Sequence, residues 1–241
     1  MFSRLLGRGG GQKQFNHVAV SLEGDDTEYI KKSKLDENQL AIRKGKILSE
    51  LLDAQTKFDI PILSVFLLSG KRVGTDFSSK VKYFNKVLDS LSFEFLHKNQ
   101  IKVSPIGKWY ELPNELVDTI KRLIDETKDY DRFFLNLCVY YTGQSELVDA
   151  ARMIARRIKK GMLTPEDITK QTIKEDLYSS HFLAPELMII NDSCKLNGFM
   201  LWDSSDACIH FTKIPWPNFS GSEFRRIINE YPTRHIKTKA I

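Results

Sequence analysis

Short apolar runs alternate with longer amphipathic stretches along most of the chain. The short runs are rich in β-branched and aromatic residues, which is typical of buried strands. They cover residues 17–24, 62–70, 101–107, 132–141 and 186–191, and a further apolar run follows at 207–212. Apolar residues recur at helical spacing over 40–58, 77–99, 113–127, 145–160 and 165–178. Near-continuous apolar strands separated by helices predict an α/β fold, with a central, mainly parallel sheet flanked by helices.

The loops that follow the predicted strands are where function is expected. In open parallel sheets, ligands bind beyond the carboxyl ends of the strands, where loops lead into helices. The loops in question cover residues 23–29, 69–75, 141–145 and 191–197. Their first polar residues include Glu23, Ser69 and Asn191, which we expect to gather at one edge of the sheet.

Composition narrows the class of protein. The chain has 241 residues, of which 41% are hydrophobic, and no apolar run approaches the length of a membrane-spanning helix. Residues 1–15 are predicted to be a flexible basic arm, for which weak contact with a membrane surface is the alternative, and residues 16–241 a single domain. The three cysteines lack CxxC spacing, so neither a disulfide framework nor a zinc site is expected, and a reducing cytosol fits.

Charge and motifs exclude several functions. The net charge of +5 is modest and the basic residues are mixed with acidic ones, so nucleic-acid binding is not expected. The densest basic cluster, at 152–160, has helical spacing and is interpreted as a solvated helix face. The sequence contains no GxGxxG after a strand, no GxxxxGK[ST], no HExxH and no GxSxG.

Three segments carry a more specific pattern. Residues 201–219 read LWDSSDACIHFTKIPWPNF, residues 97–113 read HKNQIKVSPIGKWYELP, and residues 135–152 read LNLCVYYTGQSELVDAAR. In order and spacing they resemble LWQxAYxELYFTDxxWPDF, HKNGVRLRVIGDxxxLP and LNIALNYGGRxEIVDAVR of the cis-prenyltransferases, the family of the undecaprenyl diphosphate synthases. The resemblance runs from about His17 to about Tyr231 and implies the fold of that family.

The resemblance also implies a chemistry. Members of the family condense isopentenyl diphosphate with an allylic diphosphate. An aspartate in an MDG motif holds magnesium and the allylic diphosphate, and arginines from several loops surround both diphosphates. Such cations are needed because the departing diphosphate is highly negative, and charge-assisted contacts from arginine are strong.

At the place of the MDG motif the chain reads NHVAVSLEG over residues 16–24. Glu23 stands where the family has its aspartate, so it is the candidate magnesium ligand. A carboxylate that favours the start of a helix is the alternative interpretation. The family's NGR becomes Asp25, Asp26 and Thr27, so a basic phosphate loop has become acidic.

Other loops keep few of the family's polar groups. The FSTENW loop corresponds to residues 68–73, which makes Ser69, Lys71 and Arg72 candidate diphosphate ligands, although exposed basic loop residues are common. In place of IRTSGEQRLSN, Lys195 stands for an arginine and Asn197 for a serine. Two further losses are an arginine replaced by Gln144 and a metal-binding glutamate replaced by Cys208.

These departures favour a non-catalytic subunit of polyprenyl diphosphate synthesis that pairs with a catalytically complete homologue, or with itself. The alternatives are an active enzyme, with Glu23 binding magnesium and basic loop residues replacing the arginines, and a prenyl-diphosphate binder. We expect a cytosolic protein, with the membrane surface as the alternative location. The expected subunit interface contains four aromatic residues, Tyr141, Phe211, Trp216 and Phe219.

Overall fold

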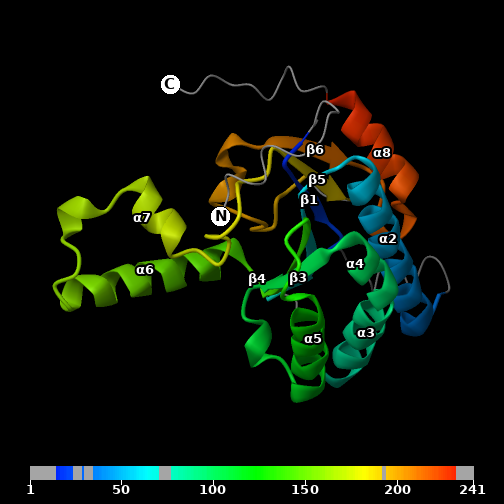
Figure 1. Cartoon of the computed structure of the whole chain (residues 1–241), viewed down its shortest axis with the longest axis horizontal. Helices are drawn as coiled ribbons and strands as arrows, with labels where there is room; N and C mark the ends of the chain where they lie inside the picture. The colour runs from blue at the N-terminus through cyan, green and yellow to red at the C-terminus, as the bar shows by residue number, and fades with distance from the viewer. Residues whose placement is uncertain (1–14, 24–28, 30–34, 71–76, 192–193, 232–241) are drawn as a thin grey trace.

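Six parallel strands form the centre of the molecule (Figure 1). The computed structural model describes residues 15–23, 29, 35–70, 77–191 and 194–231. The strands are β1 (His17–Ser21), β2 (Ile62–Ser69), β3 (Ile101–Ile106), β4 (Phe133–Tyr141), β5 (Leu187–Asn191) and β6 (Cys208–Thr212). Every neighbouring pair is parallel, in the order β3-β4-β2-β1-β5-β6. The α/β class and the parallel sheet flanked by helices are confirmed.

Helices connect the strands much as the periodicity predicts. They are α2 (Glu37–Lys57), α3 (Phe77–Asp89), α4 (Phe93–Asn99), α5 (Asn114–Thr127), α6 (Gly143–Lys159), α7 (Lys170–Glu175) and α8 (Gly221–Glu230). Short 3₁₀ turns lie at η2 (Trp109–Glu111), η3 (Pro165–Asp167), η4 (Asp203–Asp206) and η5 (Trp216–Asn218). None of the helices in the described ranges combines the length and apolarity needed to cross a bilayer.

Two of the predicted helices are shorter than expected. The helix predicted over 77–99 is divided into α3 and α4, because the Ser92 side chain accepts a hydrogen bond from the Phe95 N–H and starts a new helix. The helix predicted over 165–178 reduces to η3 and the short α7. There, Thr169 accepts a hydrogen bond from the Thr172 N–H and caps the first turn of α7. The final helix, α8, was not predicted.

Alternate residues along each strand point to opposite faces of the sheet, and both faces are buried in apolar cores. Val18 and Val20 point into the larger core, which α2, α3, α5 and α8 cover. Ala19 points into a smaller core on the other face, where Phe199 from a loop packs against the strands. Phe15 is also buried in the larger core, so the core includes the last residue of the predicted 1–15 arm.

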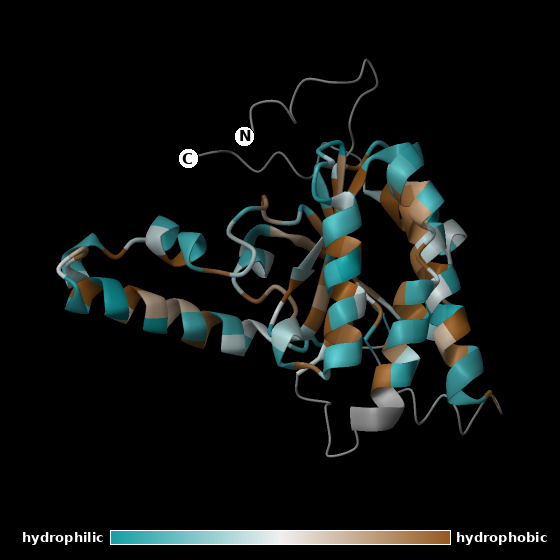
Figure 2. Ribbon diagram, turned by 60° about the horizontal axis from the view of Figure 1, so that its bottom comes forward, coloured by the Kyte–Doolittle hydropathy of each residue, from teal (hydrophilic) through white to brown (hydrophobic). Residues whose placement is uncertain are grey.

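Residues 143–175 project from the body of the molecule (Figures 1 and 2). This projection is called the arm from here on and is distinct from the basic arm predicted over residues 1–15. The arm consists of α6, the η3 turn and α7, and α6 packs against α7. Figure 2 shows apolar and polar residues alternating along α6. The basic residues of the 152–160 cluster are exposed or half-buried on this helix, as predicted.

A buried hydrogen-bond chain connects β1, β2 and β4 on the smaller face. His17 is fully buried, and its Nδ1 donates to the Leu183 carbonyl at 2.6 Å. Its Nε2 therefore accepts from the Ser64 hydroxyl at 2.7 Å, and Asn136 Nδ2 donates to the same hydroxyl oxygen at 3.1 Å. This network requires a neutral imidazole. Burial lowers the pKa of His17 from 6.5 to about 4, although the hydrogen bond to Leu183 opposes the shift.

His17 should make stability depend on pH. Because its pKa is lowered on folding, the unfolded chain takes up the proton first, and stability falls as pH drops from about 6.5 to 4. The full loss for this one group is roughly 3 kcal/mol. Urea unfolding between pH 7 and 4 should show a flatter pH dependence for His17→Gln than for the wild type. The exposed His181→Gln is the control, and equal slopes for all three proteins would refute the assignment.

Candidate functional site

The carboxyl ends of three adjacent strands bring together the polar residues that the loop analysis selected. Ser69 ends β2, Glu23 follows β1 by two residues, and Asn191 ends β5. These strands are neighbours in the sheet, in the order β2-β1-β5. Ser21 pairs with both Phe66 and Ile190, so the three polar residues lie within about one residue of the same height. The expectation that they gather at one edge of the sheet is confirmed.

This edge is also where the winding of the chain reverses. From β1 the chain moves to β2, then to the outer strand β3 and back to β4 between them, and it later places β5 and β6 on the other side of β1. The winding therefore reverses at β1, and ligands of open α/β sheets bind outside the carboxyl ends of the strands at such a point. The topology makes this the expected ligand position of the sheet.

Asn191 is a polar group that the protein leaves unsatisfied at this edge. Its side chain is 2% exposed, and within the described part of the chain neither Nδ2 nor Oδ1 has a hydrogen-bond partner. A buried polar group without a partner costs about 1–3 kcal/mol, so native proteins retain few of them. Glu23 and Ser69 are buried beside it at the neighbouring strand ends. Asn191 therefore offers a free amide donor and acceptor where the topology predicts a ligand.

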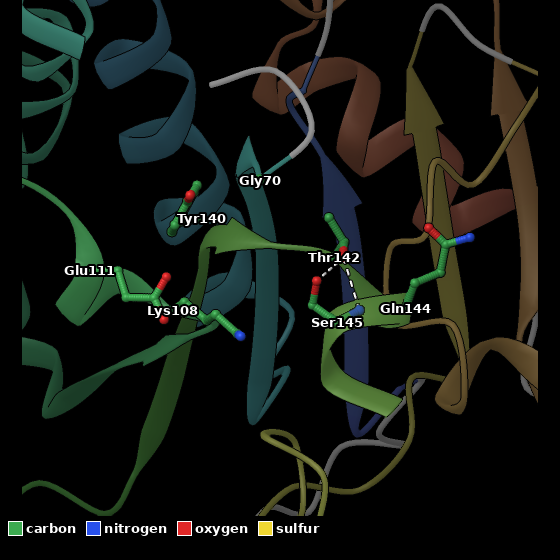
Figure 3. A pocket seen from close by; sticks show the side chains of 7 residues that line it. All are labelled: Gly70, Lys108, Glu111, Tyr140, Thr142, Gln144 and Ser145. Atoms are coloured by element: carbon green, nitrogen blue, oxygen red, sulfur yellow. Dashed lines mark hydrogen bonds between the residues drawn. The ribbon is translucent and has the colours of Figure 1, made fainter. Parts of the chain in front are cut away.

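A polar pocket lies at the carboxyl ends of β2, β3 and β4, beside the strand ends that carry Ser69, Glu23 and Asn191. Its volume is about 320 Å³. It is lined by Gly70, Lys108, Glu111, Tyr140, Thr142, Gln144 and Ser145. Figure 3 shows Lys108 and Glu111 on one side of the pocket, with Thr142 and Ser145 on the other. The Thr142 hydroxyl accepts the Ser145 N–H at 3.0 Å and so caps the start of α6.

The charge of this pocket is balanced. Lys108 Nζ lies 3.0 Å from Asp149 Oδ2, and this hydrogen bond raises the pKa of Lys108. Partial burial would raise the pKa of Asp149, but hydrogen bonds from Tyr178, Lys108 and Arg152 lower it overall. The Lys108 ammonium is thus already paired with a carboxylate, which also pairs with Arg152. Sequence analysis did not select Lys108, although its place directly after the predicted strand at 101–107 was a usable signal.

The candidate diphosphate ligands are only partly placed. Lys195 and Asn197 are exposed in the segment that follows β5, and Asn197 has a left-handed backbone with φ of 52°. Lys71 and Arg72 lie outside the described residues. Cys208 begins β6 in register with Leu187, at the amino end of the sheet, and so lies away from Glu23.

Glu23 has the carboxylate that a magnesium ligand needs, but the described residues do not supply a full set of metal ligands around it. Across the described ranges, no three His, Cys, Asp or Glu side chains come together as a metal site. Magnesium, however, is often held by one or two carboxylates, with substrate phosphates and waters completing the shell. The residues present therefore fit a metal that arrives with a diphosphate better than a metal held by protein alone.

The prediction that four aromatic residues form a subunit interface does not hold for three of them. Tyr141, Trp216 and Phe219 are buried inside the chain, so they do not present apolar surface to a partner. Tyr141 packs edge-on against Phe66 and donates a hydrogen bond to Glu146 Oε2 at 2.6 Å. Trp216 and Phe219 belong to the larger core. Only Phe211 among the four is exposed, at 45%.

The fold and the site together define a class. A doubly wound parallel sheet, with buried polar groups at the carboxyl end of its central strand, is typical of α/β proteins that bind small ligands at the point where the winding reverses. The profile of the undecaprenyl diphosphate synthase family matches residues 27–239. The chain belongs to this family of cis-prenyltransferases.

Individual relatives agree with the family assignment. The chain is 31% identical over 224 residues to an isoprenyl transferase of Prochlorococcus marinus subsp. pastoris, a match that covers 91% of this chain and 81% of the relative. It is 26% identical to the mouse protein named dehydrodolichyl diphosphate synthase complex subunit Dhdds, over 91% of this chain and 67% of that one. The fold is similar to that of lavandulyl diphosphate synthase from Lavandula x intermedia, with a TM-score of 0.80 and 24% identity over 90% of this chain and 95% of that one.

Replacing Asn191 by leucine should not weaken the fold. Leucine has the same number and branching of side-chain heavy atoms and removes two buried polar atoms that lack partners, so we expect unchanged stability or a gain of about 1–2 kcal/mol. Urea unfolding measures this. Asn136→Leu is the control, because Asn136 is equally buried but donates to Ser64 and its loss should destabilise the protein. A comparable loss for both variants would show that Asn191 is structural.

Proposed function

We propose that the chain acts in polyprenyl diphosphate synthesis as a non-catalytic subunit, which supports a catalytically complete homologue of the same fold. Family membership supports the pathway. The proposal of a supporting role depends on the cations of the site, because a substrate diphosphate must be neutralised by several of them during the reaction.

The observation that carries the proposal is the distribution of buried cations. Within the described residues, Lys44 is the only lysine or arginine with a buried side chain. Its ammonium lies 4.0 Å from the centre of the Trp216 ring and 5.3 Å from that of Tyr83, inside the larger core. Among the described residues, the strand ends beside Glu23 thus have a carboxylate and an amide but no buried arginine. Lys108 does not replace one, because its ammonium is held in an ion pair with Asp149.

The acidic loop strengthens this argument. Asp25 and Asp26 stand where the family has an asparagine–glycine–arginine sequence. Two carboxylates at that place repel a diphosphate, where the family has an attractive arginine. Each lost charge-assisted contact is worth about 1.5–3 kcal/mol, so the loss of several lowers the rate by many orders of magnitude.

Three exposed apolar side chains support the second half of the proposal, a protein partner. Val148 on α6 is 49% exposed, Phe211 on the edge strand β6 is 45% exposed, and Leu201 lies against the first residue of α6 with 37% exposed. Large apolar side chains of this kind are typical of contact surfaces. The mouse relative is named as a subunit of a complex, which is consistent with a partner for this chain.

Prenyl transfer should require a partner. We expect the purified chain to show no measurable turnover of isopentenyl diphosphate with an allylic diphosphate and magnesium, and a mixture with a complete homologue from the same genome to exceed that homologue alone. A radiometric transfer assay measures both. Magnesium-dependent turnover by the chain alone would overturn the non-catalytic role, and no effect on any homologue would overturn the supporting one.

An active enzyme is the second candidate function. It is favoured by relatives that are named as transferases and synthases, and by the carboxylate that Glu23 keeps at the end of β1. In that case Glu23 would hold magnesium, and Lys71, Arg72 and Lys195 would take the place of the missing arginines. Loss of turnover in Glu23→Gln would then identify the metal ligand. The same substitution should leave the mixture unaffected if the chain is a supporting subunit.

Association should depend on the exposed face of the arm. Val148→Asp places a charge in the proposed contact, and we expect the affinity for a partner, or for a second copy of the chain, to fall at least tenfold. Analytical ultracentrifugation measures this. Ile42→Asp is the matched control, because Ile42 is equally exposed but lies on α2. The proposed contact at Val148 would be refuted if both substitutions weakened association equally, or if neither weakened it.

A further inference from the structure

The two helices of the arm, α6 and α7, form its two legs, and both contact one short segment, residues 196–204. The N–H of Gly143, the first residue of α6, donates to the Gly198 carbonyl at 2.8 Å. On the other leg, Lys174 Nζ from α7 lies 2.8 Å from each carboxylate oxygen of Asp203. The arm therefore holds this segment near both of its ends.

The contact at the first leg leaves no free space. A Cβ atom on Gly143 would lie 2.4 Å from Leu201 Cβ and 2.6 Å from the Gly198 carbonyl oxygen. Only glycine permits such an approach, so α6 cannot shift towards the segment without displacing it. Phe199, within the segment, stacks on Phe66 of β2 with ring centres 5.0 Å apart.

The contact at the second leg is a largely buried ion pair. The side chain of Asp203 is 4% exposed and that of Lys174 is 19% exposed. Ser179 completes the site, because its hydroxyl donates to Asp203 Oδ2 at 2.6 Å and its carbonyl accepts from Lys174 Nζ at 3.1 Å. The Ser179 N–H donates to Glu146 Oε1 on α6 at 3.2 Å, which links the two legs. Removing one partner of such a pair leaves an uncompensated buried charge, so the pair resists separation.

The segment itself has a conformation that its surroundings must maintain. Asn197, Gly198 and Met200 all have positive φ, at 52°, 82° and 42°. For asparagine and methionine this conformation is costly and persists only when neighbouring contacts hold it. Asn197 is also one of the candidate diphosphate ligands, and the segment follows the carboxyl end of β5.

We infer that Lys174 is a positioning residue, which couples the placement of the arm to the conformation of the 196–204 segment and hence to the position of Asn197. A partner that binds the arm would in this way adjust the side of the site that follows β5. The identities of the ligand and of the partner rest on the proposed function, whereas the coupling itself can be measured on the chain alone.

The test is hydrogen exchange of the full-length chain in Lys174→Met, with Lys174→Arg as the conservative variant and Lys170→Met as the matched control on the exposed side of α7. The informative amides are Phe199, which donates to Leu196, and Ser204, which donates to Met200. We expect Lys174→Met to speed exchange of both at least tenfold, Lys174→Arg to restore protection, and Lys170→Met and the amides of β1 and β2 to show no change.

Two outcomes overturn the inference: faster exchange confined to the arm, or an equal increase throughout the chain. If Lys174→Met does not fold, Lys174→Met/Asp203→Asn is measured in the same way, since it leaves no unpaired buried charge. If wild type does not stimulate any homologue, the proposed function fails while hydrogen exchange still decides the coupling.

Discussion

Parallel pairing of β1 with β2 on one side and β5 on the other is the constraint on which the site depends. Parallel strands all end at the same edge, so residues nearly 170 positions apart, such as Glu23 and Asn191, become neighbours. The buried chain of His17, Ser64 and Asn136 links the amino-terminal parts of β1, β2 and β4. The functional edge is therefore positioned by contacts at the opposite end of β1.

The chain combines an intact core with a site at which the described residues include no buried arginine. Both faces of the sheet are filled, and even Lys44 is surrounded by aromatic rings in the larger core. At the strand ends, by contrast, Asn191 has unsatisfied polar atoms, which reduces stability without any structural benefit in the described part of the chain. A protein retained only for its fold gains nothing from such a residue. This contrast supports a remaining role at the edge, such as contact with a ligand or a partner, even if the chain performs no chemistry.

The arm explains how a partner and the site could communicate. Its two legs are joined to each other through Glu146 and Ser179, and to the 196–204 segment through Gly143 and Lys174. These contacts combine one backbone hydrogen bond at close approach with one buried ion pair, and neither can stretch without losing its energy. Movement of the arm is thus expected to move the segment as a unit.

Sequence by itself determined the fold class, the strand positions and the family, because buried strands and amphipathic helices leave local periodicities and because the motifs at 97–113, 135–152 and 201–219 are specific. It also identified Glu23, Ser69 and Asn191, since each follows an apolar run. Tertiary structure decided what periodicity does not encode. It showed that Trp216 is a core residue. Sequence could not decide this, because an aromatic side chain gives the same apolar pattern in a core and at an interface.

The division of the helix predicted over 77–99 and the pairing of Lys108 with Asp149 also required the structure. A serine cap competes with helix continuation through a single hydrogen bond, which apolar periodicity does not register. Likewise, Lys108 and Asp149 are separated by an entire helix and strand, so only the packing of η2 beside α6 shows that the two charges are paired. Local sequence sets which elements form, whereas long-range contacts set which side chains remain available at the site.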